Sequence, residues 1–215
     1  QTQASVIAKI DGVDYICGNA DKLSVVNAAL DLLKEGKKPA VPRICVLPPD
    51  ACGFERMKIT KFDRTRAYIK IEDGCENRCT YCAIPLIRGK LRSRPIEDIV
   101  AEARDLEALG VKELNLIAQD TSRYGLDLYG EYSLAKLVRA ITEGTTIPWI
   151  RLLYCYPDKM TDELIAEIRD NPRILKYIDL PLQHISDPVL KRMNRHGDSK
   201  MIREVNGMRK QFEQE

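Results

Sequence analysis

Residues 67–82 read Ala-Tyr-Ile-Lys-Ile-Glu-Asp-Gly-Cys-Glu-Asn-Arg-Cys-Thr-Tyr-Cys. The apolar-rich run at 67–71 predicts a β-strand. Cys75, Cys79 and Cys82 follow it on one short loop, with three residues between the first pair and two between the second. This segment therefore offers three thiolate ligands on one loop, without a fourth cysteine or histidine beside them.

The spacing of these cysteines indicates an iron–sulfur cluster. Cysteine thiolates hold such clusters, normally one to each iron of a cube, so three leave one iron free for a ligand other than protein. A zinc site is the alternative, but zinc needs four ligands, usually as paired knuckles. The fourth would have to be Cys52, or His184 or His196 from far along the chain. The pattern therefore favours a 4Fe–4S cluster whose open iron takes a substrate or cofactor.

Strands and helices alternate after residue 67. The apolar-rich runs that predict strands are 67–71, 111–118, 149–154 and 174–180. Such alternation predicts an α/β fold with a parallel sheet and right-handed crossovers, either doubly wound or curling into a barrel. In both folds active groups gather at the carboxyl ends of the strands. The cysteine loop follows the first strand and belongs to that end.

Four helices are predicted between and after these strands. An apolar stripe begins at Ile96, just after Pro95, and ends before Gly110. Ser133 and Thr161 are placed to cap the second and third helices, and the pair 187–188, Asp-Pro, opens the fourth. The result is a series of four βα units.

Residues 1–59 have a different organisation. They predict a helix, a short strand, a second helix and then an irregular stretch rich in proline from Pro39 to Pro49. The second helix carries an apolar face formed by Leu23, Val26, Ala29, Leu30 and Leu33. The proline-rich stretch marks a linker or a domain edge.

The bulk composition excludes several classes of protein. With 34 basic and 32 acidic residues, the net charge of +2 gives no general argument for nucleic acid or a membrane surface. No stretch approaches the roughly 18 apolar residues of a membrane span, and no signal-peptide pattern is found, so we expect a cytoplasmic protein without a membrane partner. Seven unevenly spaced cysteines favour reduced thiols over a disulfide framework. Because the chain lacks an initial Met and stops within a helical pattern, we expect a fragment.

The cysteine spacing resembles the signature of radical S-adenosylmethionine (SAM) enzymes, and further stretches resemble the methylthiotransferases among them. Two of these stretches are 83–89, Ala-Ile-Pro-Leu-Ile-Arg-Gly, and 92–95, Arg-Ser-Arg-Pro. The segments at 117–125, 151–157 and 180–186 look most like the RimO branch, which modifies an aspartate of a small-subunit ribosomal protein. The MiaB-like branch, which acts on transfer RNA, tends to read differently where Gln119-Asp120 and Gln183-His184 stand here.

The resemblance implies cofactors and site residues. Cys75, Cys79 and Cys82 would hold a 4Fe–4S cluster whose free iron binds SAM. Tyr81 matches the aromatic residue near the adenine, while Gln119 and Gln183, after the second and fourth strands, are candidates for cofactor placement. For either glutamine, the alternative role is to stabilise a turn. No catalytic acid or base is indicated.

The resemblance also implies a reaction and a domain plan. A radical formed from SAM would take hydrogen from the aspartate β-carbon, and a second 4Fe–4S cluster would supply sulfur. Residues 1–60 would be the tail of an amino-terminal α/β methylthiotransferase domain, and residues 61–215 the first four βα units of an incomplete radical-SAM barrel. The terminal TRAM domain would lie outside the chain, and the ligands of the second cluster mostly or wholly upstream of Gln1. An external electron donor is a further expected partner, and a non-catalytic metal-binding module remains the alternative from another class.

Other polar residues and thiols have more than one interpretation. Arg88, Lys90, Arg92 and Arg94 predict a solvated surface loop, or else a patch that pairs with the methionyl carboxylate, an acidic substrate or RNA phosphate. A hydrogen-bonded structural role is favoured over proton transfer for His184. The remaining cysteines are interpreted as packed or incidental thiols: Cys17, Cys45, Cys52 and Cys155.

Overall fold

The computed structural model describes residues 3–21, 23–48 and 65–212. Cys52, Pro49 and the expected boundary near residue 60 lie outside them. The chain divides into two compact units, one formed by 1–55 with 83–90 and the other by 56–82 with 91–215. Each unit is described by itself.

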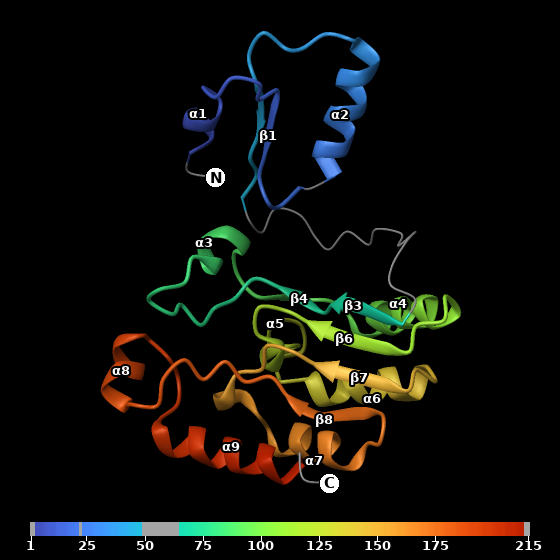
Figure 1. The fold of residues 1–215 in the computed structure, drawn as a ribbon, viewed down its shortest axis with the longest axis vertical. Coiled ribbons are helices and arrows are strands. Elements are labelled where there is room, and N and C mark those ends of the chain that lie inside the picture. The colour runs from blue at the N-terminus through green and yellow to red at the C-terminus, as the bar shows by residue number, and fades with distance from the viewer. Residues whose placement is uncertain (1–2, 22, 49–64, 213–215) are drawn as a thin grey trace. The chain divides into compact units, whose positions relative to one another are not determined.

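The first unit contains a pair of short parallel strands and a longer helix (Figure 1). Its elements are α1 (Ala4–Ile7), β1 (Tyr15–Cys17), α2 (Leu23–Glu35), β2 (Arg43–Cys45) and α3 (Ile84–Arg88). Strand β2 lies within the stretch predicted to be irregular, so that part of the prediction was wrong. It pairs with β1 in parallel, Tyr15 opposite Arg43.

Helix α2 forms as its periodicity predicts, but its apolar face is exposed. Ala28 is buried, whereas Val26, Leu30 and Leu33 are exposed. The side that packs inward has a spacing of four: Ser24 and Leu32 are half-buried one turn before and one turn after Ala28.

The second unit is built on a four-stranded parallel sheet in the order β3-β6-β7-β8. Its strands are β3 (Arg66–Lys70), β6 (Glu113–Ile117), β7 (Trp149–Leu152) and β8 (Ile174–Ile178). All four predicted strands are confirmed to within a few residues. Because each strand follows its neighbour through a helical crossover, the sheet is parallel throughout.

The helices of this unit follow its strands, four of them where they were predicted (Figure 1). They are α4 (Ile96–Ala108), α5 (Leu126–Tyr129), α6 (Leu134–Gly144), α7 (Asp162–Asp170), α8 (Asp187–Arg192) and α9 (Ser199–Phe212). Two 3₁₀ turns follow β6 and β7, η1 (Thr121–Arg123) and η2 (Pro157–Lys159). No helix in the described residues is long and apolar enough to cross a membrane.

One face of the sheet packs against helices to form the core. Alternate strand residues such as Ile69, Leu116 and Ile150 are completely buried with Ile99 of α4 and Leu137 of α6. Burial of apolar surface on this scale is the main favourable contribution to folding.

The opposite face carries charged and aromatic side chains. A polar row crosses the strands there: Arg66 and Arg151 both bond to Glu113, at 3.1 and 2.7 Å. Arg151 also lies over the ring of Tyr177, 5.1 Å from its centroid. This row fixes side chains of four neighbouring strands to one another.

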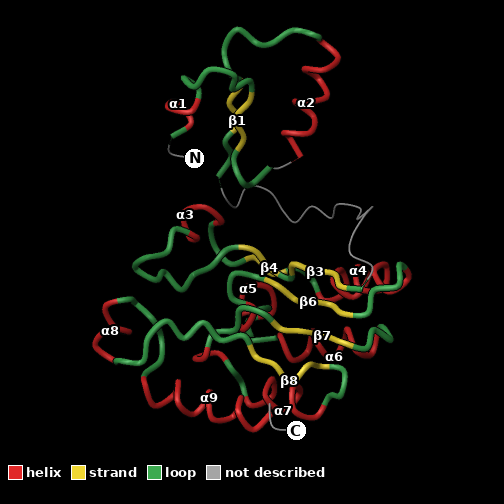
Figure 2. Tube along the Cα trace, in the orientation of Figure 1, coloured by secondary structure: helices red, strands yellow, loops and turns green. Residues whose placement is uncertain are grey.

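A small antiparallel pair, β4 (Glu72–Asp73) with β5 (Arg92–Ser93), was not predicted. It closes the base of the segment that contains the three cysteines. Figure 2 shows the loops that follow β6, β7 and β8 leaving the sheet at its left edge, the edge reached by β4.

Candidate functional site

The three cysteines lie on the loop that leaves the carboxyl edge of the sheet after β3 and β4. Cys79 is buried, while Cys75 and Cys82 are half-buried. Arg78 adopts a φ of 51° between them. The loop therefore holds one thiol inside the protein and leaves two partly accessible.

A ring of hydrogen bonds ties this loop to the ends of the next two strands. Asn77 Nδ2 donates to Asp120 Oδ2 at 2.7 Å, after β6. The second carboxylate oxygen of Asp120 accepts from the Ser122 hydroxyl, and Ser122 Oγ accepts from the backbone N–H of Tyr156 at 3.0 Å. The Tyr156 hydroxyl lies 3.0 Å from Cys79 Sγ, which closes the ring.

A second set of contacts fixes the loop from the segment after α8. Asn194 Nδ2 donates to the carbonyls of Asn77 and Arg78 at 3.2 and 3.0 Å. The backbone N–H of Thr80 donates to the Met193 carbonyl at 3.1 Å. The cysteine loop is therefore held by three separate parts of the second unit.

Non-glycine residues with positive φ concentrate at this edge. Arg78, Tyr154, Gln183 and Asn194 have φ values of 51°, 62°, 66° and 51°. Such conformations cost free energy and occur more often at functional sites. Two of the four belong to the loop and its supporting segment, and the other two follow β7 and β8.

Comparison with known protein families identifies the superfamily of this chain. Residues 69–210 match the model of the Radical SAM superfamily. The chain belongs to this superfamily. The superfamily's cofactors are a 4Fe–4S cluster and SAM, and the expected cysteine loop lies inside the matched region.

Curated relatives narrow the resemblance to one branch. Ribosomal protein uS12 methylthiotransferase RimO of Clostridium tetani is 57% identical over 139 residues, which are 65% of this chain and 31% of that protein. RimO of Clostridium novyi is 45% identical over 206 residues, 95% of this chain and 45% of that protein. The sequence is RimO-like, and the chain spans less than half the length of these relatives.

A solved structure supports the fold. The radical SAM methyltransferase TsrM from Kitasatospora setae, solved with tryptophan and a SAM analog bound, aligns with a TM-score of 0.55 at 15% identity. The match covers 68% of this chain and 28% of that one. At this identity the likeness concerns the α/β fold with its parallel sheet.

The donor set of the cysteine loop is three thiols, the ligand type that holds a 4Fe–4S cube. In the described part of the chain, no three His, Cys, Asp or Glu side chains converge closely enough to hold one metal ion. A 4Fe–4S cube does not require such convergence, because each thiolate binds a different iron. The three thiols on one loop, with a hydroxyl against Cys79, are compatible with it.

The predicted cofactor-placing residues differ in their surroundings. Gln119 Oε1 is buried and has no hydrogen-bond partner among the described residues. This carbonyl oxygen is therefore available to accept a hydrogen bond. Gln183 is exposed, and Tyr81 is 53% exposed. Burial, together with the neighbouring Cys79, raises the pKa of the Tyr81 hydroxyl.

Two carboxylic acids next to the loop are buried and electrostatically unusual. Glu72 is completely buried, and neither of its oxygens has a hydrogen-bond partner within the described residues. Burial, reinforced by Asp120 and Asp127, raises its pKa well above the ordinary value. Burial also raises the pKa of Asp120, although the hydrogen bonds from Ser122 and Asn77 act to lower this pKa. Low solvation favours the neutral acid at both positions.

The thiols divide into two kinds. Cys155, interpreted as a packed thiol, is completely buried, and this burial raises its pKa to about 12. Burial also raises the pKa of Cys75, but this thiol is half-buried on the loop. Cys155 is therefore enclosed, with the Thr121 hydroxyl 3.3 Å from its sulfur, whereas Cys75 is partly accessible.

The basic run is not one solvated loop, so that prediction was wrong for its last member. Arg94 is buried and pairs with Asp98 and Glu102 at 2.6 and 2.7 Å. Its guanidinium also donates to the Lys70 carbonyl at 2.9 Å. Arg94 therefore links α4 to the end of β3. Lys90, by contrast, is exposed.

The histidines are both exposed. His184 Nδ1 accepts a hydrogen bond from the backbone N–H of Ser186 at 2.9 Å, a local turn contact. This agrees with the structural role favoured for it.

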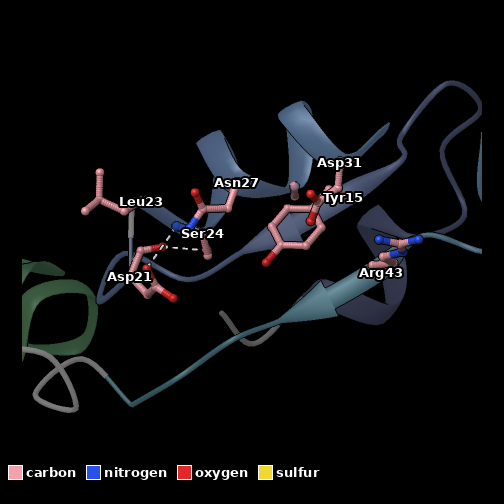
Figure 3. Close-up of a pocket in the computed structure, with 8 residues that line it drawn as sticks. Tyr15, Asp21, Leu23, Ser24, Asn27, Asp31 and Arg43 are labelled. Atoms are coloured by element: carbon pink, nitrogen blue, oxygen red, sulfur yellow. Dashed lines mark hydrogen bonds between the residues drawn. The ribbon is translucent and has the colours of Figure 1, made fainter. Parts of the chain in front are cut away.

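An open hollow of about 430 Å³ lies in the first unit, and none of its lining residues is a predicted site residue (Figure 3). Asp21 accepts from Ser24 N at 3.0 Å at one end of it, which fixes the start of α2. The lining residues are Tyr15, Asp21, Leu23, Ser24, Asn27, Ala28, Asp31 and Arg43.

Sequence reasoning missed the residues that support the cysteine loop. Asn77, Asp120, Ser122 and Tyr156 are ordinary loop residues in sequence, and their partnership depends on contacts across 34 to 77 positions. One local signal was available: each follows closely after a predicted strand, where functional side chains gather.

Proposed function

We propose that this chain is the SAM-cleaving part of a RimO-type methylthiotransferase, which adds a methylthio group to an aspartate of a small-subunit ribosomal protein. The observation that carries the proposal is the cysteine loop, held at the carboxyl edge of a parallel sheet by the Asn77–Asp120–Ser122–Tyr156 ring. RimO-named relatives that match most of the chain support the choice of substrate.

In this proposal Cys75, Cys79 and Cys82 hold the 4Fe–4S cluster. When bound, the cluster supplies the electron that cleaves SAM into methionine and a 5′-deoxyadenosyl radical. Gln119 offers its buried carbonyl oxygen to the methionyl amine, which has protons to donate. Tyr81 lies beside the adenine, and Gln183 contacts the cofactor from the end of β8.

The remaining chain has supporting roles. The four parallel strands are the first part of a radical-SAM barrel. Residues 1–60 are the tail of an amino-terminal methylthiotransferase domain, and 61–215 belong to the radical-SAM domain. In the intact protein a second 4Fe–4S cluster would be the source of sulfur, a second molecule of SAM would be the source of the methyl group, and an external donor would provide electrons.

A pair of cysteine variants tests the cluster assignment. Cys79→Ala should lose the cluster and the reductive cleavage of SAM, because a ligand is removed. Cys155→Ala is the matched control, since its thiol is buried with a pKa of about 12 and faces Thr121 at 3.3 Å. Iron and sulfide counts after anaerobic reconstitution, with 5′-deoxyadenosine by chromatography, give the result. Equal losses in both variants would contradict the assignment.

The substrate is tested in cells. Mass spectrometry of ribosomal proteins and of transfer RNA, from a strain lacking the gene and from the same strain complemented, should show methylthiolation restored on the ribosomal aspartate. Restoration on a transfer-RNA adenosine instead would favour a MiaB-like activity.

A further inference from the structure

Tyr156 makes a contact that the cysteine-loop assignment leaves unexplained. Its hydroxyl oxygen lies 3.0 Å from Cys79 Sγ. Both side chains are only 7% exposed. Because little water competes at this point, the hydrogen bond is stronger than an exposed one.

The direction of this hydrogen bond follows from the state of the sulfur. Either atom can donate while Cys79 is a free thiol. Once the sulfur is a thiolate bound to iron, it has no proton, so the tyrosine hydroxyl must donate.

Arg195 adds a positive charge behind the same ring. Its guanidinium carbon lies 3.9 Å from the Tyr156 ring centroid, and the side chain is buried. The guanidinium also donates to the Pro181 carbonyl, which holds it in place. A buried cation over the ring attracts its electrons and strengthens the hydroxyl as a donor.

The position of the hydroxyl is fixed from the backbone. The Tyr156 N–H donates to Ser122 Oγ at 3.0 Å, and Pro157 begins the turn η2 immediately afterwards. Tyr156, which follows β7, is therefore also held to the turn η1 that follows β6.

We propose that Tyr156, with Arg195 stacked on its ring, is a positioning residue that raises the reduction potential of the cluster held by the cysteine loop. The inference rests on the proposed function, because it requires the cluster to be bound there. Hydrogen bonds to cluster sulfurs and nearby positive charge stabilise the reduced, more negative cluster.

The test compares Tyr156→Phe with Tyr154→Phe in the anaerobically reconstituted protein. Tyr154 is a matched control on the same segment, with an exposed side chain. We expect Tyr156→Phe to keep its iron and to lower the equilibrium constant for one-electron reduction about tenfold, which is about 59 mV. Tyr154→Phe should leave the potential unchanged. A redox titration followed by electron paramagnetic resonance measures both, beside iron and sulfide counts.

Arg195→Met removes the charge and keeps the hydroxyl, so we expect a smaller shift in the same direction. A loaded Tyr156→Phe protein with the wild-type potential would overturn the inference, as would an equal shift in Tyr154→Phe. If Tyr156→Phe fails to hold iron, an unchanged potential in Arg195→Met overturns it. Wild-type protein that binds no cluster would instead overturn the proposed function, and iron counting separates the two failures.

Discussion

Glu72 carries an acid group into the protein interior without a hydrogen bond from the described residues. Its raised pKa means that the folded protein binds this proton more tightly than the unfolded chain does. The stability that this proton confers is complete below the ordinary glutamate pKa and is lost as the pH rises through the raised value. Ionisation of Glu72 therefore lowers the free energy of unfolding as the pH rises above its raised pKa.

We predict that Glu72→Gln changes the free energy of unfolding relative to wild type by about 1 kcal/mol more favourably at pH 8.5 than at pH 5. The amide is neutral at both values and leaves no charge to bury. Urea unfolding of both proteins at the two pH values measures the difference. Glu143→Gln, on an exposed residue, should show no such pH dependence; a similar gain there would contradict the explanation.

Single residues also show what the sequence could reveal of the site. Cys75, Cys79 and Cys82 were identifiable because their spacing is local. Tyr156 and Arg195 were not, since Tyr156 meets Cys79 across 77 positions of the sequence and Arg195 stacks on Tyr156 only in the folded unit. Arg94 was misinterpreted because a basic run in sequence does not show which member is enclosed by carboxylates.

At the scale of elements, helix α7 shows a predicted cap that forms. Thr161 Oγ1 accepts from the Leu164 N–H at 3.2 Å. Ser133 occupies the same position before α6, but its hydroxyl donates to the Glu131 carbonyl and makes no cap bond. The residue type thus predicted where each helix begins. Whether the side chain makes the cap hydrogen bond depends on the backbone conformation just before the helix.

We predict that Thr161→Ala lowers the free energy of unfolding by about 1 kcal/mol, the usual worth of such a cap. Ser186→Ala before α8 is the control, because Ser186 makes no side-chain cap bond. It should change stability by less than about 0.5 kcal/mol. Chemical denaturation measures both; equal losses would show that the cap bond is not the cause.

Element prediction succeeded where an apolar run lies between stretches of helical periodicity. The strands β3, β6, β7 and β8 are short apolar runs flanked by helical periodicity. The pairs β1–β2 and β4–β5 have strands of two or three residues, too short to show a period. Their pairing is a product of tertiary contacts.

At the scale of the whole molecule, the two units differ in their interiors. Among the described residues of the first unit, Ile16 and Ala28 are its buried apolar side chains. The second unit has one continuous core that extends from β3 to β8. Local opening is governed by buried apolar contacts of this kind.

We therefore predict that amides of α2 exchange with deuterium at least about 100-fold faster than those of β6 and β7. Exchange followed by mass spectrometry measures all these segments in one sample, so β6 and β7 are the internal control for α2. Protection of α2 equal to that of the sheet would mean that its apolar face is covered in solution.

The ring that closes on Cys79 also limits how this site can be moved by design. The residues of this ring follow three different strands. A transplanted peptide of residues 74–82 would include Asn77 but not Asp120, Ser122 or Tyr156. Grafting the cysteine loop onto another parallel-sheet scaffold would transfer the ligands without their supports. A successful graft must carry Asp120, Ser122 and Tyr156 at the ends of the host's second and third strands.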